Sequence, residues 1–303
     1  MRWLWQRRFA LPPLCLTLGI GSLASLYVWL AAWDLLKIGI WLLLFTMFAW
    51  SLLKTVTTHP GTTPDVFQVE GESGGESAFY AYETKKTGEV RVCKWCKKLK
   101  PDRCHHCRKC KMCVLKMDHH CPWVKNCIGF YNYKFFLLLI MYASALCLFM
   151  LFTMAMSTFR FCSKAAPLWL KILVCLGQLL ILLLSIALPL FTAFHIHLVK
   201  GGYTTIEYCE KKLRLRKNKQ PKDRKSGEST PPIRFVSYNL GPWQNFVAIF
   251  DENKWLWPFP LARQPPGDGI TFPTPLSSQS SRESTGLLSA ERRQPKAIDQ
   301  KLE

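Results

Sequence analysis

Four long apolar stretches alternate with polar, basic segments along this chain of 303 residues. The stretches run from about residue 10 to 33, 35 to 53, 135 to 156 and 172 to 194. Each is long enough to cross the hydrocarbon core of a bilayer, which takes about 20 apolar residues in a helix. The pattern predicts an all-α polytopic membrane protein with four transmembrane helices. The short polar link at Asp34 and Lys37 makes the first two helices an antiparallel hairpin.

The first apolar stretch admits a second interpretation, a cleaved signal peptide. Its apolar region is longer than the roughly 7 to 15 residues of a signal-peptide core, and it leads directly into the second stretch. A retained helix is therefore the favoured interpretation.

The distribution of basic residues predicts the orientation. The segment 54–134 contains 15 Lys and Arg and the chain after His197 contains 18, whereas the links at 34–37 and 157–171 contain one and three. Basic segments are retained in the cytosol, so both termini and the segment 54–134 are expected there. The predicted order is a cytosolic N-terminus at 1–9, a transmembrane hairpin at 10–53, a cytosolic segment at 54–134, two spans at 135–199, a cytosolic C-terminal segment at 200–262 and a disordered tail at 263–303.

The formal net charge of +20 is also compatible with nucleic-acid binding. The basic residues, however, are spread along two segments beside membrane helices, which favours lipid headgroups over DNA or RNA. We therefore expect the bilayer as a partner and no nucleic acid. The basic cluster from Lys211 to Lys225 follows the fourth span and is typical of a lipid-facing anchor.

A cysteine-rich block lies between Cys93 and Cys127, where eight Cys and four His stand in about 35 residues. Pairs of Cys two residues apart are usual half-sites for tetrahedral Zn²⁺. Cytosolic thiols stay reduced, so metal binding or chemistry is favoured over disulfides in this block. Two closed structural sites need eight ligands, and the regular spacing assigns Cys93, Cys96, His106, Cys107, Cys110, Cys113, His120 and Cys127.

Four Cys and His of the block are left over by this assignment: Cys104, His105, His119 and Cys121. Cys121 lies two residues from His119 and three from Asp118. A nucleophilic thiol needs a lowered pKa, a nearby base and a carboxylate that orients the base, and these three residues provide that set. Neighbouring side chains of an extended segment point in opposite directions, so His119 and His120 are expected to have different roles.

Outside the block, five cysteines lie in or beside the apolar stretches and are interpreted as packing residues or palmitoylation sites: Cys15, Cys147, Cys162, Cys175 and Cys209. An alternative for the block itself is a membrane-tethered zinc-binding interaction module or a ubiquitin-ligase-like module. A RING-type ligase would need further paired Cys after the second ligand pair, whereas an apolar stretch begins eight residues beyond Cys127.

The block and the residues that follow it, Ile128-Gly129-Phe130 and Asn132-Tyr133-Lys134, resemble the cysteine-rich domain of the DHHC protein S-acyltransferases, or palmitoyltransferases. Three further motifs agree with that family: His59-Pro60-Gly61 after the second span, Thr204-Thr205-Ile206-Glu207 after the fourth, and Tyr238-Asn239-Leu240-Gly241 with Asn245 and Phe246 in the tail. The resemblance covers roughly residues 10 to 255.

The resemblance implies an interleaved arrangement of ligands. One Zn²⁺ is expected on Cys93, Cys96, His106 and Cys113, and the other on Cys107, Cys110, His120 and Cys127. Cys121 is then the acyl-accepting nucleophile, His119 its general base, and Asp118 the residue that orients His119. Thr205 is expected near Asp118 as a supporting residue.

Three positions depart from the family pattern. His59 replaces an Asp, so any contact made by that carboxylate is in doubt, and Lys125 stands where Asn is common. Cys104 adds a thiol, which is interpreted as a solvent-facing bystander or as a second acylation site.

The function implied is transfer of a fatty acyl group from acyl-CoA, such as palmitoyl-CoA, to cysteines of proteins at an endomembrane (Golgi or ER) or the plasma membrane. A thioesterase, using the same nucleophile but passing the acyl group to water, is the alternative within enzymes. The basic cluster could also contact the CoA phosphates.

Overall fold

The computed structural model describes residues 19, 35–65, 83–84, 89–163, 165–219, 236–261 and 265–275. Within these residues three helices are long and apolar enough to cross a membrane: α3 (Leu35–Thr57), α4 (Tyr133–Cys162) and α5 (Leu168–Lys200). They confirm the second, third and fourth predicted spans. The first predicted span, 10–33, lies outside the described residues apart from Gly19.

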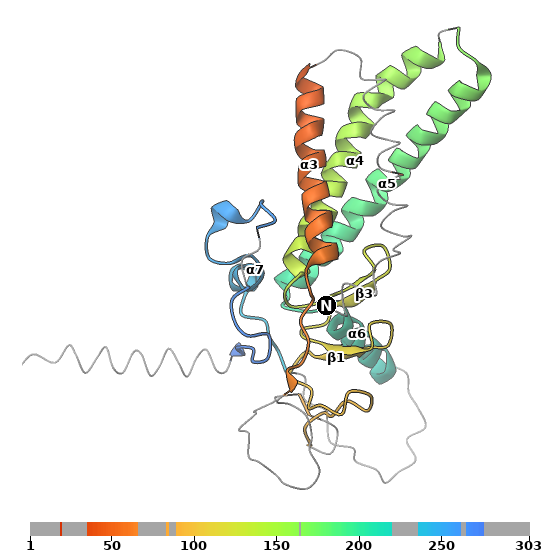
Figure 1. Cartoon of the computed structure of the whole chain (residues 1–303). Coiled ribbons are helices and arrows are strands. Elements are labelled where there is room, and N and C mark those ends of the chain that lie inside the picture. The colour runs from red at the N-terminus through yellow and green to blue at the C-terminus, as the bar shows by residue number, and fades with distance from the viewer. Residues whose placement is uncertain are drawn as a thin grey trace, which may run out of the picture.

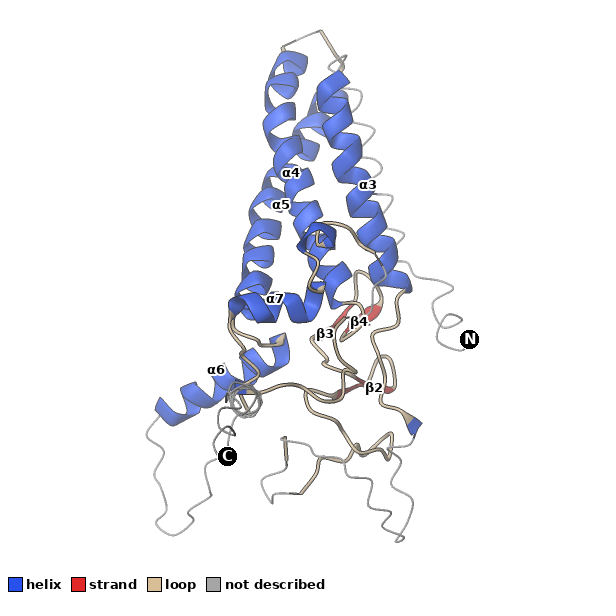
Figure 2. Cartoon of the chain, turned by 90° about the vertical axis from the view of Figure 1, so that its left-hand side faces the viewer, coloured by secondary structure: helices blue, strands red, loops and turns tan. Residues whose placement is uncertain are grey.

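The three helices stand side by side as one elongated bundle, with the cysteine-rich block at one end (Figures 1 and 2). Large apolar side chains point outward along much of its length, including Leu183 and Leu190 of α5 and Leu43 of α3. An apolar surface that runs along most of the bundle is unfavourable in water and favourable in lipid, as expected of an integral membrane protein. Inside the bundle, Trp41, Met154 and Ile181 pack together from the three helices.

The helices extend further than their apolar stretches. α4 continues to Cys162 and α5 starts at Leu168, so the predicted link at 157–171 shrinks to the turn 163–167. Residues 35–37, expected in a link, belong to α3. Polar residues such as Thr158 and Arg160 satisfy their backbone groups in a helix as well as apolar ones do. The helix α5 begins only after Pro167, its N-cap residue. A proline is tolerated at the start of a helix but not in a helix interior.

The all-α prediction was wrong for the cysteine-rich block, which contains two antiparallel β-hairpins. One pairs β1 (His105–Cys107) with β2 (Met112–Val114), and the other pairs β3 (His119–Cys121) with β4 (Asn126–Ile128). Their turns contain Lys111 and Lys125 at positive φ. Strands of three residues are too short to produce a readable alternation of apolar and polar positions, which is why the sequence pattern did not indicate them.

Two short helices follow the bundle and return the chain to the block. Four residues separate the end of α5 from α6 (Thr205–Lys219), and α7 (Pro242–Phe250) packs against α5 and α4. The 3₁₀ turn η2 (Lys254–Leu256) comes next. Asn245 joins these pieces, because its amide donates to the Lys200 carbonyl at 3.0 Å and to Asn239 Oδ1 at 2.8 Å. The tail motif thus holds the end of α5.

Candidate active site and metal centres

The hairpins gather the predicted ligands into two groups. The first contains Cys93, Cys96, His106 and Cys113, and the second Cys107, Cys110, His120 and Cys127. In each group the ligand atoms all lie within 4.8 Å of one another. The strand register accounts for half of each group, because it sets His106 opposite Cys113 and His120 opposite Cys127. These two groups could each hold a metal ion, in the interleaved arrangement that the resemblance implied.

The distances fit a tetrahedral ion. His106 Nδ1 lies 3.2 Å from Cys96 Sγ, and His120 Nδ1 lies 3.4 Å from Cys110 Sγ. Ligand atoms bound at about 2.0–2.3 Å to a tetrahedral centre are themselves about 3.3–3.8 Å apart. The Cys110 amide also donates to Cys107 Sγ at 3.4 Å, an interaction that stabilises a thiolate.

Cys104 lies beside the first group and is fully buried. It packs with Cys93 and Cys113, and its sulfur is 3.5 Å from Thr63 Oγ1. The interpretation of Cys104 as a solvent-facing bystander was therefore wrong, and its burial also disfavours a second acylation site. His105, the leftover residue on β1, belongs to neither group.

The strand β3 separates the two adjacent histidines. His120 Nδ1 faces the second group of ligands, with Cys127 Sγ at 3.6 Å. His119 Nδ1 instead contacts Asp118 Oδ2 at 2.6 Å, and the imidazole lies close enough to the Cys121 thiol for each group to shift the pKa of the other. Positions two apart in a strand share a face, so His119 and Cys121 lie together while His120 points away. The structure thus brings Asp118, His119 and Cys121 into one line of contacts.

The surroundings favour charge separation between Cys121 and His119. Burial acts to lower the pKa of His119, but the hydrogen bonds and charges of Asp118 and Cys121 outweigh it and raise the pKa to about 9. Burial acts to raise the pKa of Cys121, but the hydrogen bond from His119 and the backbone N–H groups of Val124 and Trp123 lower it. A thiolate beside an imidazolium is the reactive form of a cysteine nucleophile.

Asp118 is held from the far side by the start of α6. Thr205 donates from its backbone N–H to Asp118 Oδ1 and from its hydroxyl to Oδ2, both at 2.8 Å. Asp118 is 1% exposed, and burial raises its pKa, but the hydrogen bond and charge of His119 lower it more. The Asp118 carboxylate therefore stays charged, and its contact with Nδ1 fixes the orientation of the His119 ring. Thr205 lies where the resemblance placed it.

Two aromatic contacts that the sequence did not indicate also position His119. Its ring packs edge-on against Phe136 of α4 with centroids 5.0 Å apart, and His195 of α5 lies 6.0 Å away. His195 is buried and contacts the Tyr133 hydroxyl through Nδ1 at 3.2 Å. The ends of α4 and α5 that lie next to the cysteine-rich block thus pack against the His119 imidazole.

Arg103 is a further residue that sequence reasoning missed. Its Nε and Nη2 donate to the two carboxylate oxygens of Glu207 at 2.7 and 2.9 Å, and Nη2 also donates to the Gly202 carbonyl at 2.8 Å. The guanidinium lies against the rings of Tyr238 and Phe272. Because Glu207 is in the same turn of α6 as Thr205, Arg103 ties the block to the helix that holds Asp118. From the sequence, Glu207 of the Thr-Thr-x-Glu motif indicates at most a cationic partner. It does not identify Arg103, which lies 104 positions away.

The motif His59-Pro60-Gly61 connects the end of α3 to the cysteine-rich block through backbone hydrogen bonds. Pro60 and Gly61 accept backbone hydrogen bonds from Tyr131 and Leu115 at 3.3 and 3.2 Å. His59 Nδ1 accepts from the Gly61 N–H at 3.1 Å. An Asp side chain can make the same local turn with the amide two residues on, so His59 can replace an Asp in this local turn.

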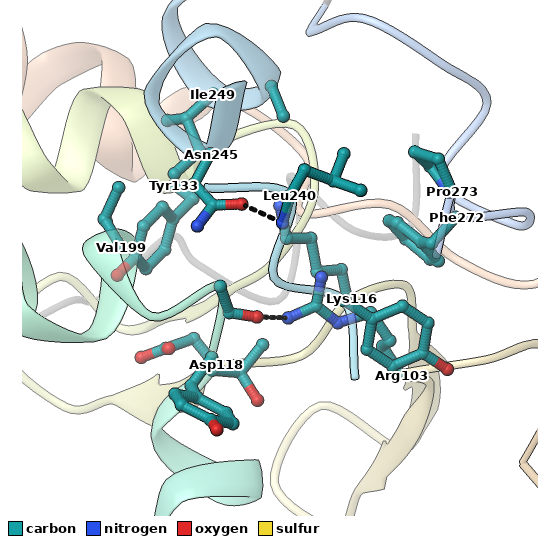
Figure 3. Close-up of a pocket in the computed structure, with 15 residues that line it drawn as sticks. Arg103, Lys116, Asp118, Tyr133, Val199, Leu240, Asn245, Ile249, Phe272 and Pro273 are labelled. Carbon is teal, nitrogen blue, oxygen red and sulfur yellow. Dashed lines mark hydrogen bonds between the residues drawn. The ribbon is translucent and has the colours of Figure 1, made fainter. Parts of the chain in front are cut away.

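Figure 3 shows a small cavity behind Asp118, bordered by Arg103, Lys116, Tyr133 and Asn245. Its volume is about 60 Å³. Pockets for drug-sized ligands measure roughly 300–1,000 Å³, so this cavity is far too small for an acyl-CoA. Its lining includes Arg103 and Thr204 but neither His119 nor Cys121, so the cavity borders the residues that support Asp118.

Comparison with known proteins identifies the family. The model of the DHHC palmitoyltransferase family matches residues 86–212. Palmitoyltransferase ZDHHC2 of Rattus norvegicus is 33% identical over 256 residues, which are 78% of this chain and 66% of the relative. Palmitoyltransferase ZDHHC15A of Danio rerio is 32% identical, covering 79% of this chain and 73% of the relative. A probable protein S-acyltransferase 12 of Arabidopsis thaliana is 34% identical, covering 76% and 77%. This chain belongs to the DHHC palmitoyltransferase family.

Proposed function

We propose that this chain is a protein S-acyltransferase that carries the acyl group on Cys121. The observation that supports this most directly is the line of contacts from Thr205 through Asp118 and His119 to Cys121, at the membrane end of the block. Cys121 is buried in the same apolar cluster as Leu52 and Phe136, so an acyl chain lying along the bundle would reach its sulfur. Such a chain partitions into the bilayer while the CoA head stays in water.

The proposed reaction has two displacements. The Cys121 thiolate attacks the thioester carbonyl of acyl-CoA, the bond from that carbon to the CoA sulfur breaks, and the CoA thiolate takes the proton that His119 holds. The thiol of a substrate protein then gives its proton to His119 and attacks the acyl-Cys121 thioester, which releases the Cys121 thiolate. Asp118 stabilises the imidazole whenever it is charged. The reaction is ping-pong because CoA leaves before the substrate thiol attacks the acyl-Cys121 intermediate.

Zinc is the metal we propose for the two groups of ligands, because three Cys and one His make a common closed zinc site. Bound there, zinc would supply folding energy and leave no open position for a substrate. His120 and Cys127 of the second group are the central pair of the β3–β4 hairpin, between the pairs made by His119 and Cys121, so an ion bound there would hold His119 and Cys121 in register.

The substrates we propose are proteins with a cysteine near the cytosolic face of a Golgi, ER or plasma membrane. Basic residues at the start of the cluster, such as Lys211, lie exposed on α6, where they suit acidic lipid headgroups.

Labelled palmitoyl-CoA tests the function directly. The purified full chain should acquire label that neutral hydroxylamine removes, with the label on the peptide containing Cys121, and should pass it to a peptide thiol. Label lost only to water would instead indicate a thioesterase. No covalent label, with two zinc ions bound, would leave the zinc-binding interaction module.

The mechanism requires the segment 54–134 to face the cytosol, where acyl-CoA and reduced thiols are found. Asn-glycosylation acceptors inserted with a spacer into the turn 163–167 should be modified in microsomes, because the basic residues predict that this turn faces the lumen. Acceptors placed within residues 62–84, a Gly-, Ser- and Glu-containing segment of low apolar density, serve as the matched control and should remain unmodified. The reverse pattern would place Cys121 away from acyl-CoA and rule out the transferase.

Arg103→Gln tests the support of Asp118 from α6. We expect single-turnover acylation to slow about 10- to 100-fold, since a small misplacement of a catalytic group has effects of this size, while two zinc ions stay bound. Arg108→Gln removes an exposed arginine of the same block and should leave the rate unchanged.

Thr205→Val shows whether Arg103 acts through Thr205. If it does, Arg103→Gln should add little to the effect of Thr205→Val, whereas independent effects would multiply. Arg103→Gln with Glu207→Gln avoids an unpaired buried carboxylate, so a loss that persists there reflects positioning rather than unfolding.

A further inference from the structure

We propose that Cys162 and Cys175 form a disulfide that joins α4 to α5 at the end of the bundle farthest from Cys121. Their sulfur atoms are 3.7 Å apart. Cys162 is the last residue of α4 and Cys175 lies two turns into α5, so the two thiols face each other across the turn 163–167. Thirteen positions separate them in the chain. The sulfur atoms of a disulfide are about 2.05 Å apart, so bond formation requires these two sulfurs to move closer together.

The depth of the two cysteines places them at the far border of the membrane. α4 has 30 residues and α5 has 33. About 20 residues cross the hydrocarbon core, so counts from Tyr133 and Lys200 reach the opposite border near residues 152 and 181. Both cysteines lie beyond these points, and Cys175, the fourth residue of the apolar stretch 172–194, lies at the border itself. Cys175 is exposed on the surface of the bundle and Cys162 is half-buried. Their depth at the border, together with this exposure, puts them within reach of an oxidant on that side.

The inference rests on the orientation given under the proposed function, but not on acyl transfer. With the cysteine-rich block in the cytosol, the turn 163–167 faces the lumen or the outside, where disulfides form and persist. The oxidant is the disulfide of a lumenal thiol–disulfide oxidoreductase. One thiolate attacks it and forms a mixed disulfide, the second displaces the enzyme's sulfur, and the oxidoreductase leaves as a dithiol with both electrons and both protons.

The cross-link would act at the end of the bundle where, apart from the two cysteines, the contacts that the structure describes between α4 and α5 are apolar. Nearer the block, α4 and α5 are joined by Ser144 Oγ with Thr192 Oγ1 at 2.9 Å and by Tyr133 with His195 at 3.2 Å. Around Cys162 and Cys175, the described contacts between the helices are apolar, through Met154, Phe161 and Val174. A disulfide here restricts sliding of α4 against α5, the two helices that carry Phe136 and His195 behind His119.

Peptide mass spectrometry of the full chain tests the proposal. Membranes that have never met a reductant are dissolved in SDS with excess N-ethylmaleimide, so that every free thiol is alkylated before digestion. We expect a cross-linked peptide pair containing Cys162 and Cys175, two hydrogens lighter than the separate thiols. Dithiothreitol should remove it and neutral hydroxylamine should not, which excludes S-acylation as the cause of protection.

Two variants make the result specific. In Cys162→Ala the Cys175 thiol should become fully alkylated, whereas Cys147→Ala, which removes a half-buried cysteine in the middle of α4, should leave the cross-link intact. Full alkylation of both cysteines in the unmodified chain would overturn the proposal. If the variant with an acceptor inserted in the turn 163–167 is glycosylated in the same membranes, only the disulfide fails; if it is not, the proposed orientation fails with it.

Discussion

Cys121→Ser should abolish the hydroxylamine-sensitive acyl adduct while leaving two zinc ions bound per chain. The hydroxyl of serine has no lowered pKa, so His119 cannot convert it into a nucleophile comparable to the thiolate. Cys121 lies outside both groups of metal ligands, so its loss leaves four ligands for each ion. Label from acyl-CoA and zinc content, measured on one preparation, separate the two roles.

Cys147→Ser is the matched control, because it removes a thiol from the apolar part of α4 without touching the block. It should retain both label and zinc. Loss of one zinc equivalent in Cys121→Ser would show that Cys121 is a ligand and that the nucleophile has been assigned wrongly. An adduct that persists in Cys121→Ser would move the nucleophile to another cysteine.

The membrane helices were predictable because hydrophobicity acts over a long window. The apolar stretches predicted α3, α4 and α5, but not their ends, which depend on local features such as Pro167 and on helical turns beyond the hydrocarbon core. The hairpins were not predictable from alternation. Their three-residue strands follow from the positions of metal ligands, as in the pairing of His120 with Cys127.

The site was predictable where its residues are neighbours in the chain. Asp118, His119 and Cys121 stand within four positions, so strand geometry alone separates His119 from His120. The grouping of ligands came only through the resemblance, since spacing gives the number of sites but not their partition. Contacts between distant segments were beyond reach. Arg103 meets Glu207 across 104 positions, and the burial of Cys104 beside Thr63 depends on the folded block.

The adjacent histidines should give the second large mutational effect, because His119 is proposed as the general base and His120 as a zinc ligand. His119→Ala should leave zinc and fold largely intact but slow acylation by roughly 10² to 10⁴, the range typical of losing a general base. His120→Ala should lower zinc content and destabilise the block, since a structural site with three ligands contributes less folding energy. Zinc content, thermal unfolding and single-turnover acylation of both variants provide the measurement, each variant serving as the other's control. Equal zinc loss in the two would contradict the division of roles.

The division follows from β3 itself: His119 contacts Asp118 at 2.6 Å on one face, while His120 faces Cys110 at 3.4 Å on the other. The same strand therefore makes metal binding and acyl transfer depend on each other's geometry without sharing a residue.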